Sequence, residues 1–226
     1  MKKQKPIVIK KPASKNILQP DKERLIARGY LPMDLLSEEI HSIGGKVAEV
    51  AGIPVFGSGN RVLFVARTMS EKVACIHTWD PKLRIYASYR DPDRSYLPTM
   101  YGTKQDFHDL YDTGECILVE GVFDRIAMKH CIPGMAVFAR LTKGIGPTHE
   151  IFLRRYAKQV WLAFDQDIPG KFATTQAFKR LGGIKGLDVY EIPYPAKDPA
   201  ALLEKKGCVR AAEILQTNMR KVGPYR

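Results

Sequence analysis

The spacing of apolar and polar residues changes character along this chain of 226 residues. Residues 47–110 contain short β-type runs separated by Gly, Asp and Pro turns, a pattern typical of a small antiparallel sheet. These runs are Arg61–Ala66, Val73–Trp79 and Leu83–Tyr89. After residue 113, apolar runs of strand length alternate with segments of helical period, which predicts right-handed crossovers and a parallel sheet.

The alternating half of the chain predicts four strands and three helices. The strands are Ile117–Val119, Met135–Phe138, Val160–Phe164 and Leu187–Ile192, and the helices are Phe123–Lys129, Thr148–Ala157 and Lys171–Leu181. Two short helices are predicted nearer the start: Asp21–Gly29, with an aspartate cap and a glycine stop, and Asp34–Ser42, ended by two glycines.

We expect an α/β protein in which a Rossmann-like parallel sheet follows a small mixed α+β subdomain. The expected divisions are a flexible basic arm (1–20), an amino-terminal subdomain (21–112), a parallel-sheet domain (113–204) and a basic carboxy-terminal tail or helix (205–226).

Composition narrows the classes of protein. A hydrophobic content of 45% can supply a core, and no apolar stretch approaches the roughly 20 residues of a membrane helix. The lysine-rich start lacks the apolar core of a signal peptide, so we expect a cytoplasmic protein, in a host cytoplasm if the gene is carried by a phage. The four cysteines are widely spaced and show no zinc-ligand pattern, so no zinc is expected.

The formal charge of +12 is concentrated at the two ends of the chain. Residues 1–28 carry +7 of it and residues 205–226 carry +5, so the body between them is neutral overall. Both ends fit either solvated tails or salt-sensitive contacts to nucleic-acid phosphates.

Acidic residues follow the predicted strands where each strand ends. Glu120 closes the first apolar run of the parallel sheet, Asp165 and Asp167 close the third, and Asp198 follows the last. Because parallel strands end at one edge of a sheet, these carboxylates are expected to converge there, and hard oxygen ligands suit Mg²⁺ better than zinc. Gly121 is expected to let the chain turn tightly, which places Asp124 on the next helix. The alternative is that each acid only caps a helix.

These acids lie in motifs that resemble those of DnaG-type primases. Glu120-Gly-Val-Phe-Asp124-Arg-Ile resembles their Glu-Gly-Tyr-Phe-Asp-Val-Ile, and Asp165-Gln-Asp167-Ile-Pro-Gly170 resembles their Asp-Gly-Asp-x-Ala-Gly, which together mark a Toprim domain. Lys197-Asp198-Pro199 resembles Lys/Arg-Asp-Pro-Asp, with Ala200 in place of the last possible ligand. Weaker upstream similarities at 59–65, 94–98 and 104–111 also fit the primase amino-terminal subdomain.

The resemblance implies a DNA primase that makes short RNA primers from ribonucleoside triphosphates by two-metal nucleotidyl transfer. It implies that Glu120 acts as ligand or general acid/base, and that Asp165, Asp167 and Asp198 hold Mg²⁺ or Mn²⁺. The residues expected at nucleic acid or nucleotide are Arg84, Arg94, Tyr96, Lys104 and Lys143. The alternation of Arg and Tyr from 84 to 104 also fits an exposed strand face.

The expected partners are a single-stranded DNA template, ribonucleoside triphosphates, and a separate helicase or template-recognition protein, with no membrane. Two other functions use the same domain. One is a Toprim nuclease, and the other is a non-catalytic DNA-binding or recombination factor, although small Toprim recombination factors carry a four-cysteine zinc site that this sequence does not contain.

Overall fold

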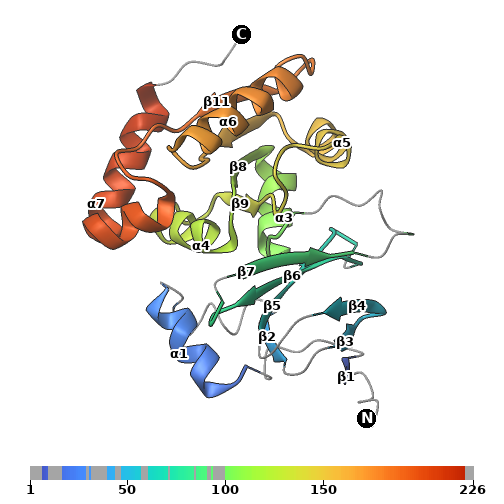
Figure 1. The fold of residues 1–226 in the computed structure, drawn as a ribbon. Helices are drawn as coiled ribbons and strands as arrows, with labels where there is room; N and C mark the ends of the chain where they lie inside the picture. Colours follow the sequence, from blue (N-terminus) through green and yellow to red (C-terminus); the bar gives the residue numbers. More distant parts are fainter. Residues whose placement is uncertain are drawn as a thin grey trace. The chain divides into compact units, whose positions relative to one another are not determined.

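The computed structural model describes residues 7–9, 17–28, 31, 40–43, 47–56, 61–70, 72–83, 85–90, 93 and 100–221. The chain forms two compact units, Met1–Leu97 and Pro98–Arg226. Figure 1 shows both as a ribbon coloured along the sequence.

The first unit contains two small sheets among its described residues. Its elements are β1 (Ile7–Ile9), α1 (Gln19–Ala27), β2 (Ile40–Ile43), β3 (Val47–Val50), β4 (Ile53–Phe56), β5 (Arg61–Arg67), β6 (Val73–Asp80) and β7 (Ile85–Tyr89). One sheet has the order β2-β5-β6-β7 and is antiparallel throughout. In the other, of order β1-β3-β4, β1 runs parallel to β3 and β4 antiparallel to it. The expected antiparallel sheet is therefore present, and the same unit contains a second sheet that the sequence pattern did not predict.

Three details of the first unit differ from the sequence prediction. The segment expected as a flexible arm contributes strand β1. Helix α1 has Leu18 rather than Asp21 as its N-cap, and Asp21 instead pairs with Arg24 at 3.0 Å. The predicted helix Asp34–Ser42 is wrong at its end, because Ile40–Ile43 is a strand paired with β5 and buries both isoleucines. Residues 34–39 and Gly29 lie outside the described residues.

Two buried histidines make the first unit sensitive to acid. His41 in β2 has both ring nitrogens buried without a hydrogen-bond partner among the described residues. Burial, with a contribution from Arg67, lowers the pKa of His41 from 6.5 to about 4. Burial likewise lowers the pKa of His77 to about 4. Both histidines are therefore neutral in the folded unit at neutral pH.

Lowering the pH from 7 to 5 is expected to destabilise the first unit. Between pH 6.5 and 4 the unfolded chain binds more protons than the folded unit. The contribution of each neutral histidine to the free energy of unfolding is therefore present above pH 6.5, and up to about 3 kcal/mol per histidine is lost as the pH drops to 4. Urea unfolding followed by Trp79 fluorescence in a Trp161→Phe background measures this loss. His41→Leu should reduce the pH dependence and exposed His108→Leu should not. Equal pH dependence in all three proteins would contradict the assignment.

The second unit is built around the predicted parallel sheet. Its elements are α3 (Lys104–Thr113), β8 (Glu115–Val119), α4 (Val122–Cys131), β9 (Ala136–Ala139), α5 (Pro147–Tyr156), β10 (Gln159–Leu162), α6 (Ile168–Leu181), β11 (Asp188–Glu191) and α7 (Pro199–Lys221). The strand order is β11-β10-β8-β9, and every pair is parallel. The four predicted strands and three predicted helices of this half are confirmed, with ends shifted by a few residues.

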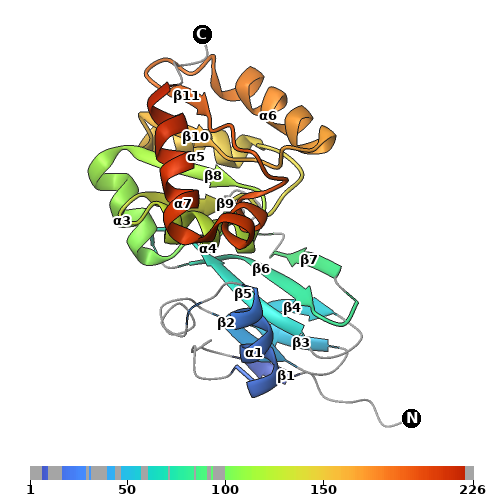
Figure 2. The same ribbon diagram turned by 90° about the vertical axis from the view of Figure 1, so that its left-hand side faces the viewer.

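Helices cover both faces of this sheet. Side chains alternate along β8, so Cys116 and Leu118 pack with residues of α3, α5 and α6 in one core cluster. Helices α4 and α7 pack together (Figures 1 and 2), and the residues of that cluster belong to other elements. No helix of the described residues is long and apolar enough to span a membrane.

Helix α3 belongs to the second unit, although the sequence analysis placed residues up to 112 in the first. It packs against β8 and β9, and the division between the two units lies before it, between Leu97 and Pro98. Two local signals mark this helix: Thr103 and Asp106 form a capping box, and Gly114 ends it in the left-handed conformation at φ 74°.

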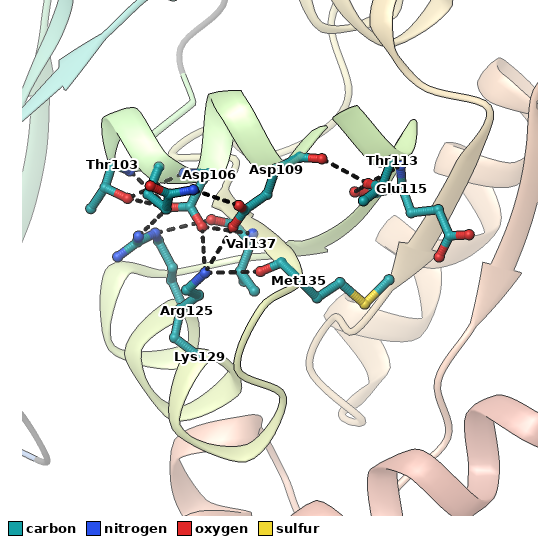
Figure 3. Close-up of polar contacts among 10 residues, drawn as sticks. Thr103, Asp106, Asp109, Thr113, Glu115, Arg125, Lys129, Met135 and Val137 are labelled. Carbon is teal, nitrogen blue, oxygen red and sulfur yellow. Dashed lines mark hydrogen bonds and ion pairs between the residues drawn. The ribbon is translucent and has the colours of Figure 1, made fainter. Parts of the chain in front are cut away.

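A buried polar network joins α3, α4 and β9 (Figure 3). The carboxylate of Asp106 pairs with Arg125 and with Lys129, the latter at 3.0 Å, and accepts the backbone N–H of Val137 at 3.1 Å. Burial alone would raise the pKa of Asp106, but Arg125 and Lys129 outweigh it and hold the pKa below its usual value. The network fixes α4, whose first turn carries Asp124, against the sheet.

Candidate active site

The predicted acidic residues lie where the parallel strands end. Glu120 directly follows β8, Asp165 comes three residues after β10, and Asp198 precedes α7, the helix that follows β11. Since β8, β10 and β11 run in the same direction, their carboxyl ends form one edge of the sheet. The expected convergence of these strand exits is therefore present.

The carboxylates influence one another electrostatically. Burial, then the charges of Glu120 and Asp198, raise the pKa of Asp165 to about 6. Burial, then Asp198 and Asp165, raise the pKa of Asp124 to about 7. Negative charge is thus concentrated at this edge, and a bound cation would offset it.

Three of the acids also cap helices. Asp167 is the N-cap of α6 and accepts the Gly170 N–H through Oδ1 at 3.0 Å. Asp198 accepts the Ala201 N–H at 2.7 Å, and Asp124 accepts the Gly121 N–H at 3.2 Å. These three acids therefore have the hydrogen bonds of the capping alternative, and the hydrogen bonds orient their carboxylates at this edge of the sheet.

Gly121 does not have the conformation expected of a tight turn. Its φ of −118° is open to any residue. A Cβ at this position would lie 3.1 Å from Oδ2 of Asp124, so space beside that carboxylate is the physical reason for glycine here.

Gly170 allows α6 to start against the backbone of Asp165. A Cβ at position 170 would overlap the Asp165 carbonyl oxygen and lie 2.7 Å from the Asp165 Cβ. Gly170→Ala is expected to destabilise the second unit by about 1–3 kcal/mol, because backbone has to move. Gly183→Ala, where a Cβ meets nothing within 4 Å, should stay within about 0.5 kcal/mol of wild type in urea unfolding. Equal stability of the two variants would contradict this account.

Two residues near the acids were missed as site residues. Lys197 Nζ lies 4.0 Å from Oδ2 of both Asp165 and Asp167, although its side chain is largely exposed. The buried hydroxyl of Tyr194 donates to the Phe164 carbonyl at 2.7 Å and so supports the segment leading to Asp165. Burial, then Asp124 and Asp165, raise the pKa of this tyrosine.

Arg140 is the third residue that the sequence analysis missed. It directly follows β9, as Glu120 follows β8, and that shared position was the available signal. Its Nη2 lies 2.8 Å from Oε2 of Glu120, and its guanidinium lies over the ring of Phe164 at 4.6 Å. Its side chain is only 2% exposed, so this basic group is part of the interior of the site.

The donor set at this edge fits a hard divalent cation. Every candidate ligand is a carboxylate oxygen, and Oε1 of Glu120 is buried with no hydrogen-bond partner among the described residues. Among the described residues, no three Asp, Glu, His or Cys side chains are already arranged to hold a metal ion. Binding would therefore require carboxylates that are already neighbours to turn toward one point.

The structure describes only two of the five residues predicted to contact nucleic acid or nucleotide. Arg84, Arg94 and Tyr96 lie outside the described residues. Lys104 begins α3 and Lys143 lies in the loop between β9 and α5, and both are exposed. His149 has a structural role, because this buried ring accepts the Gly146 N–H at 3.1 Å through Nδ1.

A family model described as Toprim-like matches residues 117–203. Residues 117–203 form a Toprim domain. This range contains all of the acidic residues of the candidate site, and it confirms the domain that their motifs indicated. No curated protein matches the sequence of the chain.

Solved structures of DnaG primases share the fold of this chain. The zinc-binding and RNA polymerase domains of Aquifex aeolicus primase match with a TM-score of 0.75 and 18% identity, over 92% of this chain and 57% of that one. The E. coli primase catalytic core matches with a TM-score of 0.72 and 18% identity, over 94% and 77%. A DnaG catalytic domain bound to single-stranded DNA matches with a TM-score of 0.72 and 17% identity, over 91% and 72%. The expected fold, that of a primase catalytic core with a Toprim domain, is confirmed.

Proposed function

We propose that this protein is the catalytic core of a DNA primase, an enzyme that condenses ribonucleoside triphosphates on a DNA template into short RNA primers. The observation that carries the proposal is the fold likeness to primase catalytic cores over 92% of the chain. It includes the first unit as well as the Toprim domain. Because the likeness to primases extends upstream of the Toprim domain, it favours the primase over a Toprim nuclease.

In this proposal the acidic residues at the edge of the sheet have different roles. Asp165, Asp167 and Asp198 would hold Mg²⁺ or Mn²⁺, with the carboxylates of Asp167 and Asp198 oriented by their capping hydrogen bonds. When bound, the cation would stabilise negative charge on the reacting phosphate oxygens. Glu120 would act beside it as ligand or general acid/base. Burial, then the charges of Glu120 and Asp198, raise the pKa of Asp165, and a cation at this position would offset them, which supports this placement.

The proposed partners follow from the same comparison. One DnaG catalytic domain of this fold was solved with single-stranded DNA, which supports a single-stranded template for this chain. Exposed Lys104 and Lys143, together with Arg84, Arg94 and Tyr96, are proposed to contact template or nucleotide. A separate helicase or template-recognition protein is proposed to deliver the template.

The test is primer synthesis by the purified chain. Protein, single-stranded DNA, labelled ribonucleotides and Mg²⁺ or Mn²⁺ are mixed, and products are resolved on a gel with Asp165→Asn as the control. Short RNA made only by the wild type supports the primase. Shortened DNA without RNA would replace this proposal with the nuclease, and DNA binding without either product would favour the non-catalytic factor.

A further inference from the structure

A single buried arginine contacts the ends of two other strands of the Toprim sheet. Arg140 follows the edge strand β9, and its backbone N–H donates to the Val119 carbonyl of β8 at 3.0 Å. Its guanidinium reaches Glu120, the residue after β8, at 2.8 Å. The same group lies over Phe164, the residue before Asp165. One side chain therefore connects Glu120 with the segment that positions Asp165.

The surroundings of Arg140 are unusual for an arginine with only a packing role. Burying a guanidinium is costly, and an apolar residue of similar volume often fills such a position at no loss of stability. Glu120 is the ion-pair partner, whereas Nε and Nη1 are buried without a hydrogen bond to the described residues. Incomplete pairing of a buried charge points to a requirement for positive charge at this place.

We propose that Arg140 is a positioning residue that holds Glu120 by one oxygen and places a fixed positive charge at the acidic edge. The inference rests on the proposed function and refines it. Because Oε2 of Glu120 faces Arg140, Glu120 is not free to be a full metal ligand. Asp165, Asp167 and Asp198 then form the cation-binding set, and Glu120 acts beside it as general acid/base through Oε1.

Arg140→Met is expected to bind Mn²⁺ about tenfold more tightly than wild type, since a positive charge near the cation has been removed and Glu120 is released. Its kcat for primer synthesis is expected to fall at least about tenfold, with little change in the KM for nucleotides, because Glu120 is no longer oriented. A purely structural role would weaken both properties together.

The binding measurement uses the full chain and Mn²⁺ alone, without DNA or nucleotides, and follows free Mn²⁺ by electron paramagnetic resonance. Arg155→Met is the matched control, because Arg155 is exposed on α5 over Tyr156 and should change neither property. Weaker or unchanged Mn²⁺ binding by Arg140→Met would overturn the inference. So would the absence of Mn²⁺ binding by wild type.

Arg140→Lys decides the question if Arg140→Met does not fold, as judged by its circular dichroism melt. Lysine keeps the charge but not the planar group that lies on Phe164, so Mn²⁺ affinity should stay within about twofold of wild type while kcat falls. An unchanged kcat would overturn the positioning role. If wild type binds Mn²⁺ but makes no RNA, the proposed function fails, whereas the binding comparison still decides the role of Arg140.

Discussion

Asp167→Asn is expected to fold as wild type does and to lose primer synthesis by about a thousandfold, since a cation contributes several kcal/mol of charge stabilisation. Folding and primer synthesis are expected to respond differently because Asp167 uses one oxygen to cap α6. Asparagine caps helices as well as aspartate does, but it is a poor ligand for Mg²⁺ because it carries no charge. RNA yield on a gel and the thermal midpoint of the same preparation measure the two effects.

Two further variants sharpen this experiment. Asp167→Ala removes the cap as well and should cost about 1 kcal/mol of stability in addition to activity. Asp188→Asn makes the same chemical change at an exposed residue that begins β11, away from the strand exits, and should alter neither property. Normal RNA yield from Asp167→Asn would remove this residue from the proposed metal site.

Asp106→Ala is expected to destabilise the second unit by about 3–5 kcal/mol, because it leaves the buried charge of Arg125 without its carboxylate. Asp106 is fully buried, Arg125 is 1% exposed, and Lys129 pairs with the same carboxylate. Arg125 also donates to the Val137 carbonyl at 3.0 Å, so the loss spreads from α4 to β9.

The chain contains two tryptophans, and each unit has one of them. In a Trp79→Phe background, Trp161 fluorescence during urea unfolding therefore reports on the second unit alone. Asp112→Ala on the same helix α3 is the control, because Asp112 is exposed and should change stability by less than about 0.5 kcal/mol. A loss below about 1 kcal/mol for Asp106→Ala would show that the network is not a main source of stability.

The amino-acid sequence by itself determined the parallel sheet and its acidic edge. Apolar runs in 113–204 form the strands, of which β8, β9 and β10 are almost entirely buried, and the length and spacing of these runs carry enough local information to place all four. The acids then follow from topology alone, because strands with right-handed crossovers must end on one side. The motifs around Glu120 and Asp165 also indicated that this sheet belongs to a Toprim domain.

Local patterns misled the prediction where pairing partners are distant. The local sequence pattern predicts a helix that includes Ile40–Ser42, yet antiparallel pairing with β5 makes Ile40–Ile43 a strand. Helix α3 was passed over because it follows a β-rich stretch, although Thr103, Asp106 and Gly114 carry its capping signals. Its membership of the second unit depends on packing against β8 and β9, which no local pattern encodes.

Only the tertiary structure decided which charges meet. Asp106 lies on α3 whereas Arg125 and Lys129 lie on α4, and Arg140 is 20 residues from Glu120, so the sequence could not pair them. Burial also set the pKa of Asp165 and Asp124, since desolvation depends on what covers a carboxylate and not on its neighbours in the chain. Sequence thus placed the acids at one edge, and packing decided their protonation and their partners.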